Sequence, residues 1–407
     1  MAEVGQRDAS GKVVGGQAKI NISGTGNKFV GDNVSFISEN QAKAKASLDS
    51  KGGTLGLSIG VPKAEAKLQG GAAVEIASGQ TFVANDVNFS SAGASPKDEQ
   101  SYNAEADIVG GSGSAVIVTV NTANAIVNTE SILSVGSEKY QTGSWQETSF
   151  ESHEKKNEAQ ANEQEPITET TLKAGRASIK DGGTNVNMLV GPTVNTKATA
   201  KGLVTVGAIA SGTNKAYTEN TSKAIFNFNP GTFEAESLRI VLGTVDKSST
   251  FATGNGGGII GVSPVAAHAE HKNDSDVTLN IGNQETPTVF NLEKDFFLGV
   301  ANLVGEDINS NAIQAALLGG SGVEAASTNI SNANLNLTNT TINAKGEVAL
   351  DAENYLEFNK NTDYVIKGNG YGLGNVDVAK FNNVITQNAN INLKNTKITS
   401  EGKLDIA

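Results

Sequence analysis

The chain has 407 residues, a formal net charge of -12 and no cysteine. Hydrophobic residues make up 38% of it but aromatic residues only 5%, so any core must be built mainly from small and β-branched side chains. The acidic balance argues against a nucleic-acid partner, which needs a dense Lys and Arg face, and the absence of Cys excludes disulfides, thiolate metal sites and a cysteine nucleophile.

Short alternating segments recur along the chain in one pattern: apolar-x-apolar, a turn of Gly, Asn or Ser, then apolar-x-Ala-x-x-apolar-x-apolar. Such alternation predicts short strands whose alternate side chains share a face. The copies that begin at Ala333 and Ala389 align without a gap, which makes the pattern an internal repeat of 56 residues. The anchor positions of seven degenerate copies are Ile20, Val74, Leu133, Phe226, Leu279, Leu335 and Ile391.

A glycine-rich and then apolar tract precedes most anchors. It begins after Lys51, Val109, Lys201 and Asn255. A phosphate-binding loop would need Lys and Ser or Thr at fixed places after the glycines, and none of these tracts has them. We expect the tracts to be lateral β-hairpins that stack on one another, with membrane-inserting hairpins as the alternative.

The repeat predicts an all-β fold in which residues 1–407 form one continuous parallel β-helix, because no single unit can bury its own apolar face. One coil of such a fold takes about 20 residues, so each repeat is expected to be two coils plus a side excursion. About 14 coils, spaced about 4.8 Å apart, would give a rod of about 65 Å. The positions expected inside are Ile76, Phe82, Val87 and Phe89, and an Asn ladder is expected in the turns at Asn336 and Asn392.

Two segments interrupt the repeat. The first, residues 137–170, is an acidic insertion expected to project as a helix or loop, with Tyr140, Trp145 and Phe150 as candidate partner contacts. The alternative is a surface loop that has no binding role.

The second interruption, residues 289–320, is predicted to be an apolar or helical insertion. Ser310 is suited to cap a short helix that ends at Leu318. Phe296 and Phe297 belong to the densest apolar cluster of the chain; packed on the flank of the rod they would shield an edge, and exposed they would be candidate partner contacts.

The Gly-apolar tracts, the Ala-x-Ala steps at Ala64 and Ala267, and the strands of the form V-x-A-x-x-V-x-F together resemble filamentous haemagglutinin-like adhesins of Gram-negative bacteria, and most of all the leukotoxin-family filamentous adhesins of fusobacteria. The resemblance implies a right-handed β-helix, export by two-partner secretion, a secreted or cell-surface location, and a role in host-cell attachment or leucocyte killing. The family's N-terminal secretion domain has no counterpart here. We therefore expect an interior piece of a longer polypeptide, flanked by further repeats.

Chemistry has few candidate residues. His268 and His271 form an H-x-x-H step that fits no metal-ligand template, and a Ser/His/Asp triad has no supporting signature, although triads assemble in space. The Gly-rich segment 368–377 departs from the register of calcium repeats and occurs once. We predict no enzyme activity, no metal and no cofactor.

The resulting functional prediction is an extracellular rod that presents surfaces to a host cell, in particular a leucocyte, through a protein or glycan receptor, with membrane contact as a further option. Two alternatives stay open. A lytic, pore-forming segment would leak liposomes, and a carbohydrate-active β-helix enzyme would turn over a polysaccharide.

Overall fold

The protein is all-β. The computed structural model describes residues 1–7, 9, 13–92, 102–136, 149–153, 169–171, 184–202, 205–228, 231–285, 287–358 and 366–407. These ranges contain 28 strands and no helix, and hence no helix that could cross a membrane.

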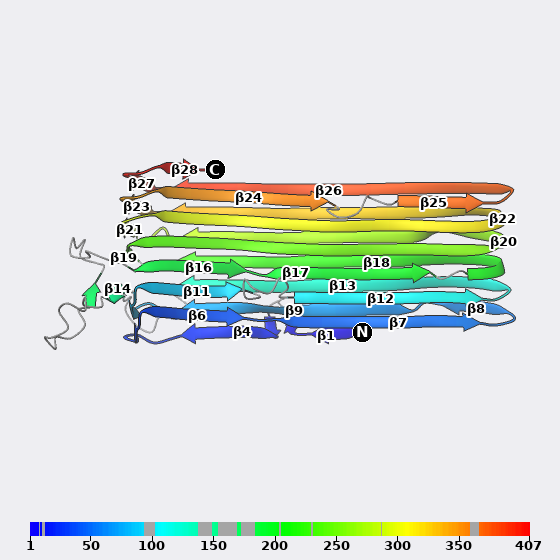
Figure 1. Cartoon of the computed structure of the whole chain (residues 1–407), viewed down its shortest axis with the longest axis horizontal. Helices are drawn as coiled ribbons and strands as arrows, with labels where there is room; N and C mark the ends of the chain where they lie inside the picture. Colours follow the sequence, from blue (N-terminus) through cyan, green and yellow to red (C-terminus); the bar gives the residue numbers. More distant parts are fainter. Residues whose placement is uncertain are drawn as a thin grey trace, which may run out of the picture.

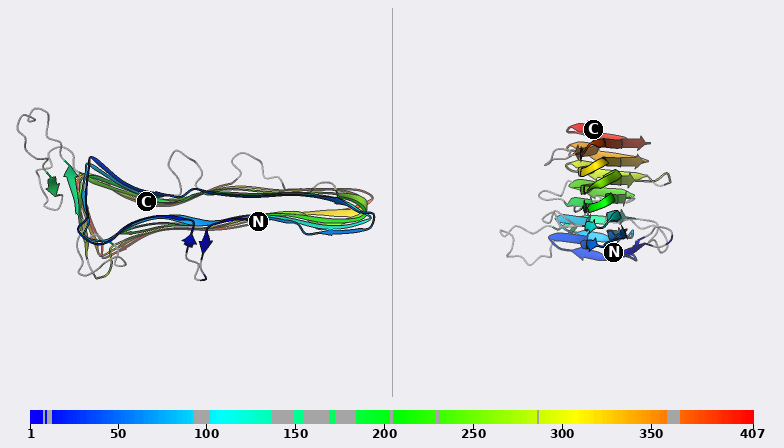
Figure 2. Two further views of the ribbon diagram at one scale, coloured as in Figure 1. Left: turned by 90° about the horizontal axis from the view of Figure 1, so that it is seen from below. Right: turned by 90° about the vertical axis from the view of Figure 1, so that its right-hand side faces the viewer.

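The chain winds in flattened circuits that lie on top of one another (Figure 1). Each circuit runs along one long side, reverses at a narrow end, returns along the other long side and crosses a short third side where the two long sides splay apart (Figure 2). In one circuit, β6 (Asn33–Glu39) and β7 (Ala42–Gly53) run out, β8 (Leu57–Gly60) and β9 (Lys63–Ile76) return, and β10 (Thr81–Val83) forms the short side.

The other strands fall into the same three groups. The outgoing side also contains β11 (Asp86–Ala92), β12 (Tyr102–Gly113), β16 (Asn185–Gly191), β17 (Thr193–Gly202), β24 (Val348–Phe358), β25 (Ile366–Tyr371) and β28 (Leu404–Ile406); the returning side contains β1 (Ala2–Val4), β4 (Gln17–Ile22), β13 (Val116–Val135) and β26 (Gly374–Lys394). Three long strands continue through the reversal, namely β18 (Thr205–Phe228), β20 (Ser237–Ile281) and β22 (Phe296–Thr338). The short side contains β5 (Lys28–Val30), β14 (Ser149–His153), β19 (Thr232–Ala235), β21 (Thr288–Leu292), β23 (Thr340–Ala344) and β27 (Lys397–Ser400). Two antiparallel additions are β2 (Gln6–Arg7) with β3 (Val13–Gly15), and β15 (Glu169–Thr171) on β14.

The repeat predicted from the sequence is the structural unit. Each anchor is paired in parallel with the anchor of the neighbouring circuit: Val74 pairs with both Ile20 and Leu133, and Phe226 pairs with both Leu133 and Leu279. Leu335 pairs in the same way with Leu279 and Ile391. The anchors are therefore confirmed residue by residue, and the side-chain pattern sets the register of the whole stack.

The expected coil size was wrong. Because Leu335 pairs directly with Ile391, one repeat of 56 residues is one circuit and not two coils. The long sides make the difference, since β22 alone has 43 residues and spans both of them. About seven circuits at about 4.8 Å give a stack roughly 30 Å high, half of the predicted length.

The predicted lateral hairpins are also corrected. The Gly-apolar tracts are the reversals at the narrow end, and they stack from circuit to circuit, as Val116 on Ile209 and Ile260 on Leu318 show. Glycine is required there because successive reversals approach closely. A Cβ on Gly258 would lie 2.1 Å from the carbonyl oxygen of Gly207.

The core has two parts. At the splayed end it is built from aromatic and large aliphatic side chains, including Phe82, Phe89 and Phe290, and the predicted interior residues Ile76 and Val87 are buried there too. Towards the narrow end it is built mainly from alanines of the Ala-x-Ala steps, which let the two long sides approach each other. The size of the inward side chain thus sets the spacing between the sides.

Residues 289–320 are not an insertion. They form β21 and the outgoing part of β22, which pair with both neighbouring circuits. No helix begins at Ser310. Instead, buried Ser310 and Ala312 alternate with outward Asn311 and Ile313, which is the pattern of a strand with one face in the core.

Candidate functional site

The structure separates the predicted contact residues. Phe296 is 1% exposed and packs against Phe290 in the core, so the prediction that it contacts a partner was wrong. Phe297, the next residue, points outward with its ring 5.4 Å from the Arg239 guanidinium. Tyr140 and Trp145, with most of the predicted insertion 137–170, lie outside the described residues; Phe150 falls in β14, in register with Phe82.

A polar cluster is buried between the two long sides. His271 on the returning side lies at its centre, facing Asp246 and Glu306 from the outgoing side, and all three side chains are inaccessible to solvent. Ser, Thr and Asn side chains at the neighbouring inward positions complete it: Thr218, Asn220, Ser248, Asn273, Ser327 and Asn329.

His271 is held by hydrogen bonds at both ring nitrogens. Its Nδ1 lies 2.9 Å from Thr218 Oγ1, and its Nε2 lies 3.3 Å from Ser248 Oγ. Burial disfavours the charged imidazolium and lowers the pKa of His271 to about 3. The imidazole is therefore neutral at physiological pH.

The two carboxyl groups respond to burial in the opposite direction. Burial raises the pKa of Asp246 well above its usual range, nearby Asn220 lowers it in part, and the charge of Glu306 raises it further. No hydrogen bond of good geometry reaches either carboxyl oxygen of Asp246. Burial likewise raises the pKa of Glu306, although its Oε2 accepts bonds of 2.9 Å from both Ser327 and Asn329.

This cluster is not placed as a catalytic triad. A triad nucleophile must be open to its substrate, whereas the hydroxyl groups at the two ring nitrogens, those of Thr218 and Ser248, are buried together with His271 and Asp246. Within the described ranges, no group of three or more His, Asp or Glu side chains is arranged to hold a metal ion. The cluster is best described as a polar section of the core.

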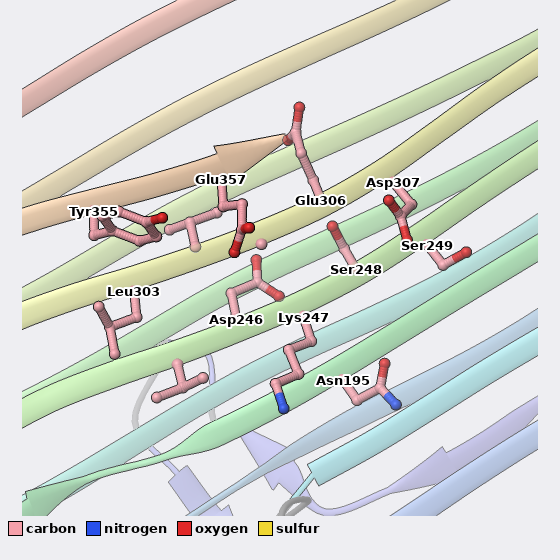
Figure 3. A pocket seen from close by; sticks show the side chains of 13 residues that line it. Asn195, Asp246, Lys247, Ser248, Ser249, Leu303, Glu306, Asp307, Tyr355 and Glu357 are labelled. Atoms are coloured by element: carbon pink, nitrogen blue, oxygen red, sulfur yellow. The ribbon is translucent and has the colours of Figure 1, made fainter. Parts of the chain in front are cut away.

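The outer face of the same strands carries a groove of about 500 Å³ (Figure 3). The register places Lys247, Gly305 and Glu357 in one outward column across three circuits. Because Gly305 has no side chain, the column has a gap, and this gap is the floor of the groove. Leu303 and Tyr355 form a neighbouring column on one side, and Ser249 and Asp307 stack on the other.

The groove combines an apolar wall with polar groups. Tyr355 is 54% exposed and offers a ring face beside Leu303. Asp307, Glu357 and Asn195 supply carboxylate and amide oxygens. Burial, and then the charge of Glu357, raise the pKa of Asp307. Such a wall beside hydrogen-bonding groups suits a polyhydroxylated ligand with one apolar face.

Sequence reasoning singled out His271 but missed its partners Asp246 and Glu306, and it missed the groove. Counting back along the register from the confirmed anchors would have placed Asp246 and Glu306 at inward positions, where charged residues are unusual. The groove depends on one outward glycine in a column of longer side chains, a signal that appears once the pairing partner of each residue is known.

No protein-family model, curated protein or solved structure matches this chain.

Proposed function

We propose that the chain is a section of a secreted rod, a right-handed parallel β-helix, whose outer surface binds glycans of host cells in the manner expected of a filamentous adhesin. The observation that carries this proposal is the groove over Gly305. It lies on stacked parallel strands: β20 and β22 pair with strands on both sides, and Tyr355 and Glu357 on β24 are paired with β22, which limits the movement of the lining residues.

The groove chemistry favours a sugar. A pyranose ring would pack its apolar face on Tyr355 and Leu303, while its hydroxyl groups would donate to Asp307 and Glu357. The lining carries the carboxyl groups of Asp307 and Glu357 against the single cation Lys247, which disfavours sialic acid and other anionic sugars, so neutral or amino sugars are the expected ligands.

The test is binding of the chain to a panel of neutral, amino and acidic oligosaccharides, followed by titration of any ligand found. Gly305→Val fills the floor, and the strand tolerates it because a Cβ there comes no closer than 3.7 Å to the Asp246 carbonyl oxygen. Gly52→Val is the matched control, since a Cβ at Gly52 meets nothing within 4 Å and lies away from the groove. We expect Gly305→Val and Tyr355→Ser to weaken binding at least about tenfold and Gly52→Val to bind normally.

Cell binding tests the wider role. Labelled protein is incubated with leucocytes and epithelial cells together with a viability dye, alongside Gly305→Val and a variant that lacks residues 137–170. Saturable binding that Gly305→Val abolishes supports the proposal. Binding lost only with the deletion would place adhesion in that segment, dye entry would favour a lytic protein, and release of reducing sugar from the panel would favour an enzyme.

A further inference from the structure

Within the described residues, the narrow end of the stack carries no charged side chain. The six segments that form the reversals and their flanks contain no Asp, Glu, Lys, Arg or His, although 18% of the chain is charged and an average segment of eleven residues would carry about two charges. We call this surface the uncharged edge, and its described residues are 52–62, 110–122, 202, 205–214, 253–267, 311–323 and 368–376.

The uncharged edge exposes large apolar side chains. Ile259 is 60% exposed, and Leu317 and Leu318 are 50% and 54% exposed, although their circuits have neighbours on both sides. Several exposed apolar side chains on one edge without a charged residue among them are unusual on a protein surface and mark a contact with an apolar partner. Further exposed members are Leu55, Leu57, Ile59, Val61, Val118, Ile209, Ile313, Tyr371, Leu373 and Val376.

The apolar side chains lie on both flanks of the edge. Ile313 is on the outgoing side, Val118 is on the returning side, and Ile259 and Leu317 are at the reversal itself. The edge is the thin end of the molecule, where the two long sides meet (Figure 2). A second protein would cover one flank of such a wedge, whereas a fluid lipid layer can surround it.

Backbone groups of the edge form hydrogen bonds between neighbouring circuits. The amide of Thr54 donates to Gly113, that of Ile209 to Ala115, and that of Leu373 to Leu317, each at 3.0 or 3.1 Å. Peptide groups that enter lipid need such partners because no water is available there. Behind the reversals, Asn121 donates to Asn214 at 2.7 Å, whereas the buried side-chain amide of Gln314 has no hydrogen-bond partner within the described residues.

We propose that the uncharged edge inserts into the outer region of a lipid bilayer and anchors the stack edge-on to the membrane. Apolar side chains on both flanks gain burial, no charge has to be desolvated, and the reversals keep their hydrogen bonds. The insertion is shallow, because charged residues flank the edge on both sides, for example Lys51 and Lys63. This contact is independent of the groove.

The test uses vesicles of pure phosphatidylcholine, which carry no sugar, so it cannot succeed or fail through glycan binding. In a Trp145→Phe background, a tryptophan is introduced by Leu317→Trp at the edge or by Ile37→Trp at the splayed end as a control of equal exposure. Brominated lipids are expected to quench the tryptophan at position 317 and leave that at position 37 unchanged. Equal quenching at both positions, or none at either, would overturn the proposal.

A second pair of variants measures the energetics. Leu317→Glu combined with Ile259→Glu is expected to reduce vesicle partitioning at least about tenfold, since each charge must be desolvated in the bilayer. Leu189→Glu combined with Ile37→Glu, at exposed positions away from the edge, is expected to have no such effect. Dye enclosed in the vesicles is expected to be retained. Complete release of the dye would show that the protein lyses the membrane, and the anchoring proposal would be wrong. Self-association that the edge variants abolish, without vesicle binding, would assign the edge to a second copy.

Discussion

His271 Nε2 lies 3.6 Å from Asp246 Oδ2, with both side chains fully buried between the long sides. Burial drives the pKa of the imidazole down and that of the carboxyl group up, so both groups are neutral over a wide range of pH. The pair is therefore a polar part of the core. The contribution of Asp246 to stability falls as the pH rises, whereas that of His271 falls as the pH is lowered.

Asp246→Asn is expected to stabilise the protein at pH 8. The folded pKa of Asp246 is raised, so its favourable contribution is complete below the unfolded pKa and is lost as the pH rises through the folded value. An amide has the same shape and stays neutral. The gain should be about 1–3 kcal/mol at pH 8 and vanish near pH 4, measured by denaturant unfolding at both pH values. Asp274→Asn, at an exposed position, is the control; a gain for Asp246→Asn that is equal at both pH values would refute the assignment.

His271→Gln is expected to weaken the dependence of the free energy of unfolding on pH in the acid range. The folded pKa of His271 is lowered to about 3, so its contribution is present above the unfolded pKa of about 6.5 and is lost as the pH falls below that value. At pH 7 the variant should lose about 1–3 kcal/mol with the bond to Thr218. This deficit should shrink between pH 6.5 and 4.5 in parallel urea titrations. His268→Gln, at a partly exposed position, serves as the control, and a constant deficit would contradict the prediction.

Phe296 and Phe297 provide a matched test of the register. Phe296→Ala should cost about 3–5 kcal/mol, because it leaves a cavity beside Phe290 in the core. Phe297→Ala should cost less than about 1 kcal/mol, since that ring lies outside over Arg239. Equilibrium unfolding of the two variants measures both values. Similar costs would mean that the strand is shifted by one residue.

The repeat and its anchors were predictable because identical positions stack on one another, and stacking leaves a period in the sequence. Ile20, Val74 and Leu133 were found in this way without any knowledge of the fold. The size of a circuit was not predictable, because period alone does not reveal how often the chain turns within a repeat. The apolar stretch around Phe296 was mistaken for an insertion. A dense run of apolar residues is compatible both with a buried strand and with an inserted segment that packs on the flank of the fold.

The candidate site was less accessible to sequence reasoning for a related reason. The groove depends on residues from three circuits, and Lys247, Gly305 and Glu357 become neighbours only when the register is known. The residues chosen from composition, Trp145 and Tyr140, were selected as rare aromatic residues in a polar segment, and their role remains a prediction. Outward positions carry little periodic signal, because many side chains are compatible with an exposed strand face.

The outward Asn ladder is expected to stabilise the stack through paired amides. It was predicted in the turns, but it lies on the strands: Asn336 donates to Asn280 at 3.0 Å and accepts from Asn392 at 2.8 Å. Asn336→Asp removes the donor to Asn280 and keeps the acceptor, so it should cost about 0.5–1.5 kcal/mol at pH 7. At pH 3 a protonated carboxyl group can donate again, and the deficit should largely disappear.

Thermal unfolding of this variant and of Asn369→Asp, at an exposed position on β25, would be compared at pH 7 and pH 3. The control separates the ladder from the general effect of an added negative charge on a chain that already carries -12. If both variants lose the same stability at pH 7, added charge accounts for the result and the ladder contributes nothing. A loss of stability that occurs only in Asn336→Asp and disappears at pH 3 would show that the ladder needs a hydrogen-bond donor at this position. Protonation of the new carboxyl group restores that donor, and the control variant accounts for the removal of the charge.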